Sequence, residues 1–136
     1  MMKRGLFTLA MTGIACVPLA SPARALDLNA FRAAHKLPPL SYSATLASAA
    51  YEHAQALARR QRLDHKGFKD RVGSLVAGRA AENVSYGCET QDCAIRQWAR
   101  SARHRRNMLL NGISAYGIAS AKSDKGRTYW VLELGN

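Results

Sequence analysis

The first 25 residues constrain this chain most, because they decide which part of it folds. Two basic residues near the start are followed by an uncharged stretch over 5–23 whose centre, 6–19, is apolar. The small residues Ala23 and Ala25 then flank a single position. A basic start, an apolar centre and a small-x-small site form the pattern of a secretory signal peptide. We therefore predict a signal peptide over 1–25, cleavage before Leu26, and a secreted or periplasmic protein.

Two other interpretations of this segment stay open. The uncharged run is just long enough to cross a membrane as a retained anchor. Pro18 and Pro22 make it a poor span, so cleavage is favoured and no stable transmembrane segment is expected. A lipoprotein cleaved at Cys16 is disfavoured, because 13–15 lacks the usual aliphatic residue three places upstream.

Cleavage would leave a small basic protein. Removing residues 1–25 from the 136 leaves 111, enough for one domain with one core, over 26–136. Without Lys3, Arg4 and Arg24, the 20 Lys and Arg become 17 against 9 Asp and Glu, a net charge of +8. An apolar fraction of 48% excludes wholesale disorder. The leader also removes Cys16, which leaves Cys88 and Cys93 as an even pair.

Hydrophobic periodicity predicts helices first and a hairpin last. Helical spacing indicates helices over about 26–35, from a cap at Ser43 to about 60, and over 94–102, with a short turn over 104–110 capped by Ser101. A short helix or turn is expected within 68–78. Alternation predicts strands over 81–86, 113–121 and 127–134, the last two joined by a turn at 123–126. This order is typical of an α+β layered domain.

Three titratable side chains and one short cysteine loop stand out for their chemistry. His65 lies in a polar loop, Glu82 lies between residues that look buried, and His104 lies in a basic segment. Two histidines and a carboxylate suit either a zinc site or an acid–base cluster. Gaps of 17 and 22 residues match no compact metal motif, so the spacing alone favours three satisfied structural residues over a metal or catalytic role.

Cys88 and Cys93 bracket a loop and the first turn of a helix. Export into an oxidising compartment favours a disulfide between them over a free or metal-binding pair. Such a short loop would mainly fix the chain near Glu82.

Six segments in order along the chain resemble the CAP superfamily, the SCP-domain family of cysteine-rich secretory, antigen 5 and pathogenesis-related proteins. The segments are Leu37-Pro38-Pro39-Leu40, the alanine-rich helix with His53, Asp64-His65, Ala81-Glu82-Asn83-Val84, Trp98-x-x-Ser101-x-x-His104-Arg105-x-Asn107-Met108-Leu109, and Gly117-Ile118-Ala119 with Tyr129-Trp130-Val131. The resemblance covers nearly all of 28–135 and is nearest to the bacterial branch. It implies a single-domain α-β-α sandwich with a central antiparallel sheet.

The resemblance also implies a cleft lined by two histidines and two acids. By motif position these are His65, Glu82 and His104, with Ser101 where the family pattern has its second glutamate. The two histidines would be the metal ligands, for zinc or another divalent ion, and Glu82 would orient them or accept loop amides. No nucleophile lies next to a base, so no catalytic residue is assigned and an enzyme is disfavoured. Asn83 and Asn107 are expected to hold the backbone around the cleft.

Basic residues suggest a partner for the surface. Arg96, Arg100 and Arg103 recur at i, i+4 and i+7 and would form a stripe on one helix face for anionic lipid or cell-wall polymer. A second basic cluster comprises Arg59, Arg60, Arg62, Lys66, Lys69 and Arg71. Either could instead be a solvated face. Nucleic acid is not expected, since no recognition motif occurs and the protein is exported.

The sequence thus favours a non-enzymatic binding module of the cell envelope. Two alternatives remain, a metal-dependent hydrolase of the peptidase type acting on envelope substrates and a lipid- or sterol-binding protein.

Overall fold

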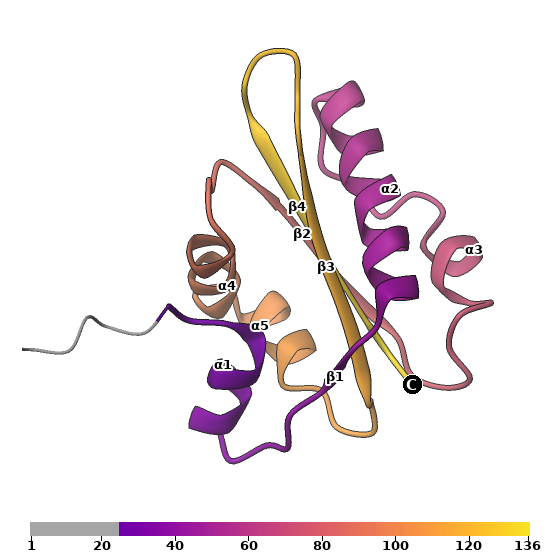
Figure 1. Ribbon diagram of the computed structural model, residues 1–136, viewed down its shortest axis with the longest axis vertical. Coiled ribbons are helices and arrows are strands. Elements are labelled where there is room, and N and C mark those ends of the chain that lie inside the picture. Colours follow the sequence, from indigo (N-terminus) through magenta and orange to yellow (C-terminus); the bar gives the residue numbers. More distant parts are fainter. Residues whose placement is uncertain (1–24) are drawn as a thin grey trace, which may run out of the picture.

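The computed structural model describes residues 25–136 as helices packed on both faces of a four-stranded sheet (Figure 1). The predicted leader lies almost wholly outside the described residues. In chain order the elements are α1 (Leu28–Ala34), β1 (Ser41–Tyr42), α2 (Ala44–Arg60), α3 (Phe68–Val72), β2 (Ala81–Tyr86), α4 (Gln91–Ala99), α5 (Ala102–Met108), β3 (Ala115–Lys122) and β4 (Thr128–Gly135). No helix within 25–136 combines the length and apolar character that crossing a membrane requires.

The sheet has the order β1-β3-β4-β2, with β4 buried along its whole length. β4 pairs antiparallel with both β2 and β3, as the hairpin prediction required. The two-residue β1 adds a parallel pair, Ser41 with Ala115 and Tyr42 with Tyr116, so the sheet is mixed rather than wholly antiparallel. The predicted α-β-α sandwich is confirmed, with this short parallel edge added.

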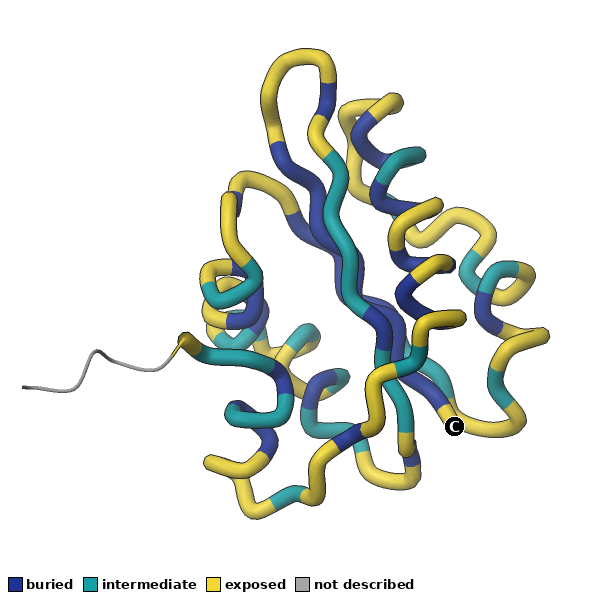
Figure 2. Tube along the Cα trace, viewed as in Figure 1, coloured by how far each residue is buried: buried dark blue, intermediate teal, exposed yellow. Residues whose placement is uncertain are grey.

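Alternation along β4 divides the core into two layers. Trp130, Leu132 and Leu134 pack with α1, α4 and α5 on one face of the sheet. Tyr129 and Val131 pack on the other face with the alanine-rich side of α2, which includes Ala50 and Ala54. Figure 2 shows the buried stretches of the strands enclosed between these helices. Glu133 alternates with Leu132 and Leu134, so its side chain lies on the face of the sheet that α2 covers.

Local capping explains where most helices begin. Asp27 accepts a hydrogen bond from Ala30 N at 2.7 Å, and Ser43 accepts one from Leu46 N at 3.2 Å. Thr90 accepts one from Cys93 N at 3.2 Å, so α4 begins at Gln91, before the predicted start. These side chains satisfy helix N–H groups that otherwise have no intrahelical partner.

The chain breaks at Ser101 rather than continuing the preceding helix. α4 ends at Ala99, and Ser101 has the extended backbone of an N-cap, φ −100° and ψ 120°, before α5. Ser101 makes no side-chain capping bond, so the predicted cap is confirmed in position only. The break separates Arg96 on α4 from Arg103 on α5. The predicted single-face arginine stripe is therefore wrong.

Candidate functional site

Two glutamates lie side by side in the middle of the sheet. Glu82 of β2 pairs directly with Glu133 of β4, so both side chains project from the same face, toward α2 and α3. Glu82 is 5% exposed and Glu133 is fully buried. Two carboxylates this close inside a protein repel each other unless a cation or a proton separates their charges.

Arg71 supplies that cation from α3. Its guanidinium donates from Nη2 to Glu82 Oε2, and from Nε to Glu133 Oε1 at 3.0 Å. Nη1 donates to the carbonyl oxygen of Lys66 at 3.0 Å, which anchors the loop before α3. The side chain of Arg71 is only 12% exposed. One arginine therefore binds both acids and ties the short helix α3 to the sheet.

The pKa values of the two glutamates shift in opposite directions. Burial and the adjacent Glu82 raise the pKa of Glu133 to about 9, so Glu133 is neutral at pH 7. Burial also acts to raise the pKa of Glu82, but hydrogen bonds from Glu133, Arg71 and His65 outweigh it and lower that pKa. The opposite directions of the two shifts favour a single negative charge on the pair at neutral pH.

Glu82 orients the ring of His65. His65 Nδ1 lies 2.6 Å from Glu82 Oε1, and a carboxylate can only accept, so Nδ1 carries the proton. A neutral His65 then presents an unprotonated Nε2. Its side chain is 56% exposed, which leaves this nitrogen open to solvent. The predicted contact between His65 and Glu82 is present, in the geometry of a carboxylate that sets an imidazole tautomer.

His53 of α2 is a second imidazole against Glu82. Its Nε2 lies 2.9 Å from the carbonyl oxygen of Asp64 and 3.6 Å from Glu82 Oε1. Because a carbonyl only accepts, Nε2 is the protonated nitrogen. The residue is 3% exposed, and burial lowers its pKa. His53 therefore fixes the loop that carries His65, and its Nε2 is not free to bind a metal.

His104 approaches the same region from α5. Asn83 Nδ2 donates to the carbonyl oxygen of His104 at 3.0 Å. Asn107 Nδ2 donates to Asn83 Oδ1 at 2.9 Å and to the carbonyl oxygen of Glu82 at 3.3 Å. Burial is the main cause that lowers the pKa of His104, and the positive charge of Arg103 acts in the same direction. The two asparagines thus hold the backbone as expected.

The donor set limits the metal chemistry that this site can support. Within 25–136 no three His, Cys, Asp or Glu side chains are placed to hold an ion together. Both oxygens of Glu82 are already engaged, and Ser101 makes no contact with the His65–Glu82 pair among the hydrogen bonds described. The donors of the described residues therefore do not fit a three-ligand catalytic zinc site.

A surface groove of about 690 Å³ runs beside this cluster, between α2 and the α3 segment. Arg71 and His53 are among its lining residues, together with Glu52, Lys66 and Asp70. His65, Glu82 and His104 are not. This groove therefore borders the Glu82 network on the side of Arg71.

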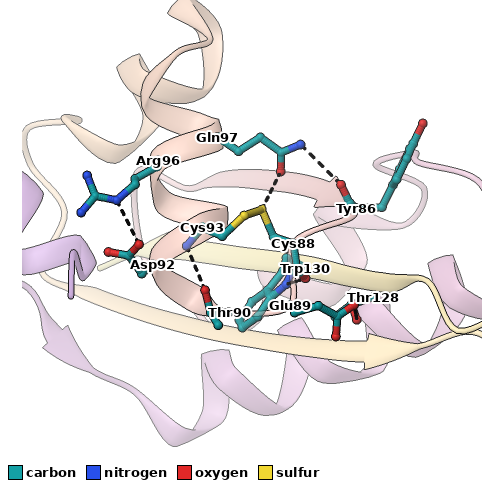
Figure 3. Close-up of a disulfide and its surroundings, with 10 residues drawn as sticks. All are labelled: Tyr86, Cys88, Glu89, Thr90, Asp92, Cys93, Arg96, Gln97, Thr128 and Trp130. Atoms are coloured by element: carbon teal, nitrogen blue, oxygen red, sulfur yellow. Dashed lines mark hydrogen bonds and ion pairs between the residues drawn. A yellow bond between two sulfur atoms is a disulfide. The ribbon is translucent and has the colours of Figure 1, made fainter.

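The loop after β2 is closed by a disulfide between Cys88 and Cys93 (Figure 3). Trp130 Nε1 donates to the carbonyl oxygen of Cys88 at 2.7 Å, which fixes the loop to β4. The predicted pairing is present, between the loop end and the first turn of α4.

The sequence singled out His65, Glu82 and His104, and it did not indicate that Arg71 and Glu133 belong to the same network. Arg71 lies in a basic segment that could face solvent or an anionic partner, and only the fold shows that its side chain bonds to the two buried acids. Glu133 gave a signal, because it shares the predicted strand face of Tyr129 and Val131. A carboxylate among buried apolar neighbours requires a partner.

Comparison with known proteins decides the family. Residues 27–134 match the profile of the CAP family, described as the cysteine-rich secretory protein family. This chain belongs to the CAP family. No curated protein sequence matches it.

Solved structures share the CAP fold at low sequence identity. An outer surface protein from Borrelia burgdorferi has a TM-score of 0.71 and 19% identity over 80% of this chain and 86% of its own. An extracellular SCP-domain protein from Bacillus anthracis has a TM-score of 0.70 and 21% identity, over 80% of this chain and 37% of its own. NaASP2, crystallised with Zn²⁺, has a TM-score of 0.52 and 15% identity, over 71% of this chain and 59% of its own. At these identities the likeness is one of fold.

Proposed function

We propose that this CAP domain is an exported, non-enzymatic binding module that takes a divalent metal ion at His65 and His104. The observation that carries the proposal is the bond between His65 Nδ1 and Glu82 Oε1, which leaves Nε2 free in an exposed ring. Neutral imidazole is the commonest protein ligand for zinc and related ions. Export is supported by the leader pattern and by relatives described as outer-surface and extracellular proteins.

Glu82 acts in this proposal from outside the coordination shell. Arg71 occupies Oε2 and His65 occupies Oε1, so the carboxylate orients a ligand rather than binding the ion. Carboxylates hydrogen-bonded to a metal-bound imidazole raise its basicity and fix its tautomer. A bound zinc ion would supply a Lewis acid with water in its open positions.

The same geometry disfavours the hydrolase alternative. Both oxygens of Glu82 are hydrogen-bonded, and its lowered pKa makes it a weak base at neutral pH. His65 could accept a proton, but among the described residues the only hydrogen bond of its ring is to Glu82, and no serine, threonine or cysteine side chain bonds it. A nucleophile activated by an adjacent base is therefore missing from this part of the chain.

Zinc binding to the exported full chain, measured by titration calorimetry and native mass spectrometry without chelators, tests the proposal. We expect one ion per chain and at least a tenfold loss of affinity in both His65→Ala and His104→Ala. Glu82→Gln should cost about 10–100-fold. His35→Ala is the matched control, since His35 lies on the distant end of α1 and its Nδ1 faces the carbonyl oxygen of Phe31.

Equal zinc affinity in parent, His65→Ala and His104→Ala would overturn the proposed site. Zinc-dependent cleavage of peptide or envelope substrates, lost in both variants, would replace the binding module with the hydrolase.

A further inference from the structure

A partly buried contact at the start of the domain joins Leu26 to α4. The backbone nitrogen of Leu26 donates to Asp92 Oδ1, across 66 positions of sequence. The side chain of Leu26 packs against the core layer that includes Ile95 and Trp98 of α4. Leu26 is also the residue at which the sequence predicts that the mature chain begins.

We propose that cleavage of the Ala25–Leu26 bond creates an α-ammonium group that forms an ion pair with Asp92, and that this pair fastens the mature N-terminus to α4. The inference is independent of the metal site. It depends on the position of the new amine, which the fold already places against a carboxylate.

The chemistry of cleavage changes the character of this contact. Hydrolysis by a leader protease breaks the C–N bond, adds the hydroxyl of water to the Ala25 carbonyl carbon and leaves the remaining proton on the Leu26 nitrogen. An α-amino group has an ordinary pKa of about 8, so at neutral pH it takes up a further proton and is mostly cationic. The hydrogen bond from a neutral amide to the Asp92 carboxylate therefore becomes an ion pair, which adds the attraction between two opposite charges.

One oxygen of Asp92, Oδ1, is available to pair with the ammonium group of Leu26. Its second oxygen, Oδ2, accepts from Arg96 Nε at 2.9 Å, as Figure 3 shows. Oδ1 is left for Leu26. Hydrogen bonds from Arg96 and Leu26 lower the pKa of Asp92, so it is ionised at neutral pH. Its place in the first turn of α4 also favours negative charge through the helix dipole.

The position of the amine is fixed to a single residue. Leu26 is held by its side chain in the core, and the next residue, Asp27, uses its carboxylate to cap α1 through Ala30 N. An additional residue before Leu26 would carry the ammonium past Asp92, because the chain leaves the core at the exposed Ala25. Only cleavage at the Ala25–Leu26 bond therefore places the new ammonium group beside the Asp92 carboxylate.

A two-by-two set of exported full-length chains tests the pair. The first change inserts one glycine between Ala25 and Leu26, which keeps the cleavage site and moves the mature amine by one residue. The second change is Asp92→Asn. The set comprises the parent, each single variant and the double variant, with intact mass confirming where every mature chain begins.

We expect the parent to begin at Leu26 and the inserted glycine to lower Tm by about 2 °C, the shift that a weak ion pair gives in a domain of this size. In the Asp92→Asn background the same insertion should change Tm by less than half as much. The cycle removes the separate effect of losing the Arg96 contact. Labelling of the α-amine at pH 7 should be about threefold slower in the parent than in Asp92→Asn, as expected for half a pKa unit.

A mature chain that begins at any other residue would overturn the proposal. So would an insertion cost that is equal in the parent and in the Asp92→Asn background, because the amine and the carboxylate would then be uncoupled.

Discussion

At the scale of single residues, Arg71 decides whether Glu82 and Glu133 can be buried side by side. Its guanidinium binds both carboxyl groups, and removing it would leave two buried acids without a cation. Breaking a buried ion pair from one side costs far more than losing a surface pair, because the remaining charge stays desolvated. We therefore expect Arg71→Met to lower the free energy of unfolding by about 3 kcal/mol at pH 7 in urea denaturation.

Arg60→Met is the matched control for this prediction. Arg60 pairs with Asp64 at 2.9 Å, but its side chain is 37% exposed. Loss of an exposed pair should cost about 0.5 kcal/mol. If both variants lost the same small amount, Arg71 would be an ordinary surface residue and the buried network would not hold α3.

Glu133 sets the direction of the pH dependence. Its pKa is raised from 4.5 to about 9, so between these values the folded state binds a proton that the unfolded state has released. Stability then falls as pH rises, by at most about 1.4 kcal/mol per pH unit for one proton. Glu133→Gln keeps the shape of the neutral acid and cannot ionise. We expect its Tm to exceed that of the parent at pH 8–9 and to decline less between pH 6 and 9.

Thermal unfolding across that pH range checks the prediction, with Glu52→Gln, an exposed acid on α2, as the control. A parent and a Glu133→Gln variant with parallel pH profiles would show that Glu133 is ionised in the folded protein.

The parts of the candidate site that could be predicted are those whose immediate sequence neighbours indicate burial or a loop. Glu82 lies in a predicted strand between residues that look buried, and His65 follows a helix end, so both stood out as site candidates. Arg71 could not be distinguished from Lys66 and Lys69, which share its basic segment. The side chain that reaches the buried acids is decided by the path of the loop into α3, which is a property of tertiary packing.

At the scale of elements, Gly117 determines how closely α2 lies on the sheet. A Cβ at this position would fall 2.0 Å from the backbone nitrogen of Ala47. The alanine-rich face of α2 makes this approach possible, because its small side chains let the helix lie close to the strand. Overpacking against backbone atoms cannot be relieved by a rotamer change, so Gly117→Ala should cost about 3 kcal/mol.

Gly126→Ala separates crowding from backbone strain. Gly126 has φ +78° in the β3–β4 turn, and no atom lies within 4 Å of its missing Cβ. We expect only the left-handed penalty there, about 1 kcal/mol by urea denaturation. A cost for Gly117→Ala no larger than this would mean that α2 can move away from β3.

Element types followed from periodicity, whereas some boundaries did not. Strands β2, β3 and β4 were predictable because alternation and a turn glycine agree, whereas the two-residue β1 was not. The junction of α4 and α5 was predicted less well, since Arg96, Arg100 and Arg103 keep a helical spacing through the break. Helix α4 ends at Ala99 because the backbone is extended at Ser101. The spacing of the arginines does not indicate this change of conformation.

At the scale of the whole molecule, charge is distributed over both helical layers. The predicted mature chain has a net charge of +8, and such an excess attracts anionic surfaces in a salt-dependent way. Arg100 and Arg103 lie near the α4–α5 junction on one side of the sheet, whereas Arg59 and Lys69 lie with α2 and α3 on the other (Figure 1). All four are exposed.

Because no single helix face collects these charges, we expect attraction to follow total charge rather than one surface. Co-sedimentation with phosphatidylglycerol vesicles at 50 and 300 mM NaCl would compare two double variants, Arg100→Glu with Arg103→Glu and Arg59→Glu with Lys69→Glu. Each removes four units of charge, so both should weaken binding at low salt to within about threefold of each other and neither should matter at high salt. If only the double variant at Arg100 and Arg103 lost vesicle binding, the result would instead indicate a local anion-binding surface at the α4–α5 junction, beside His104.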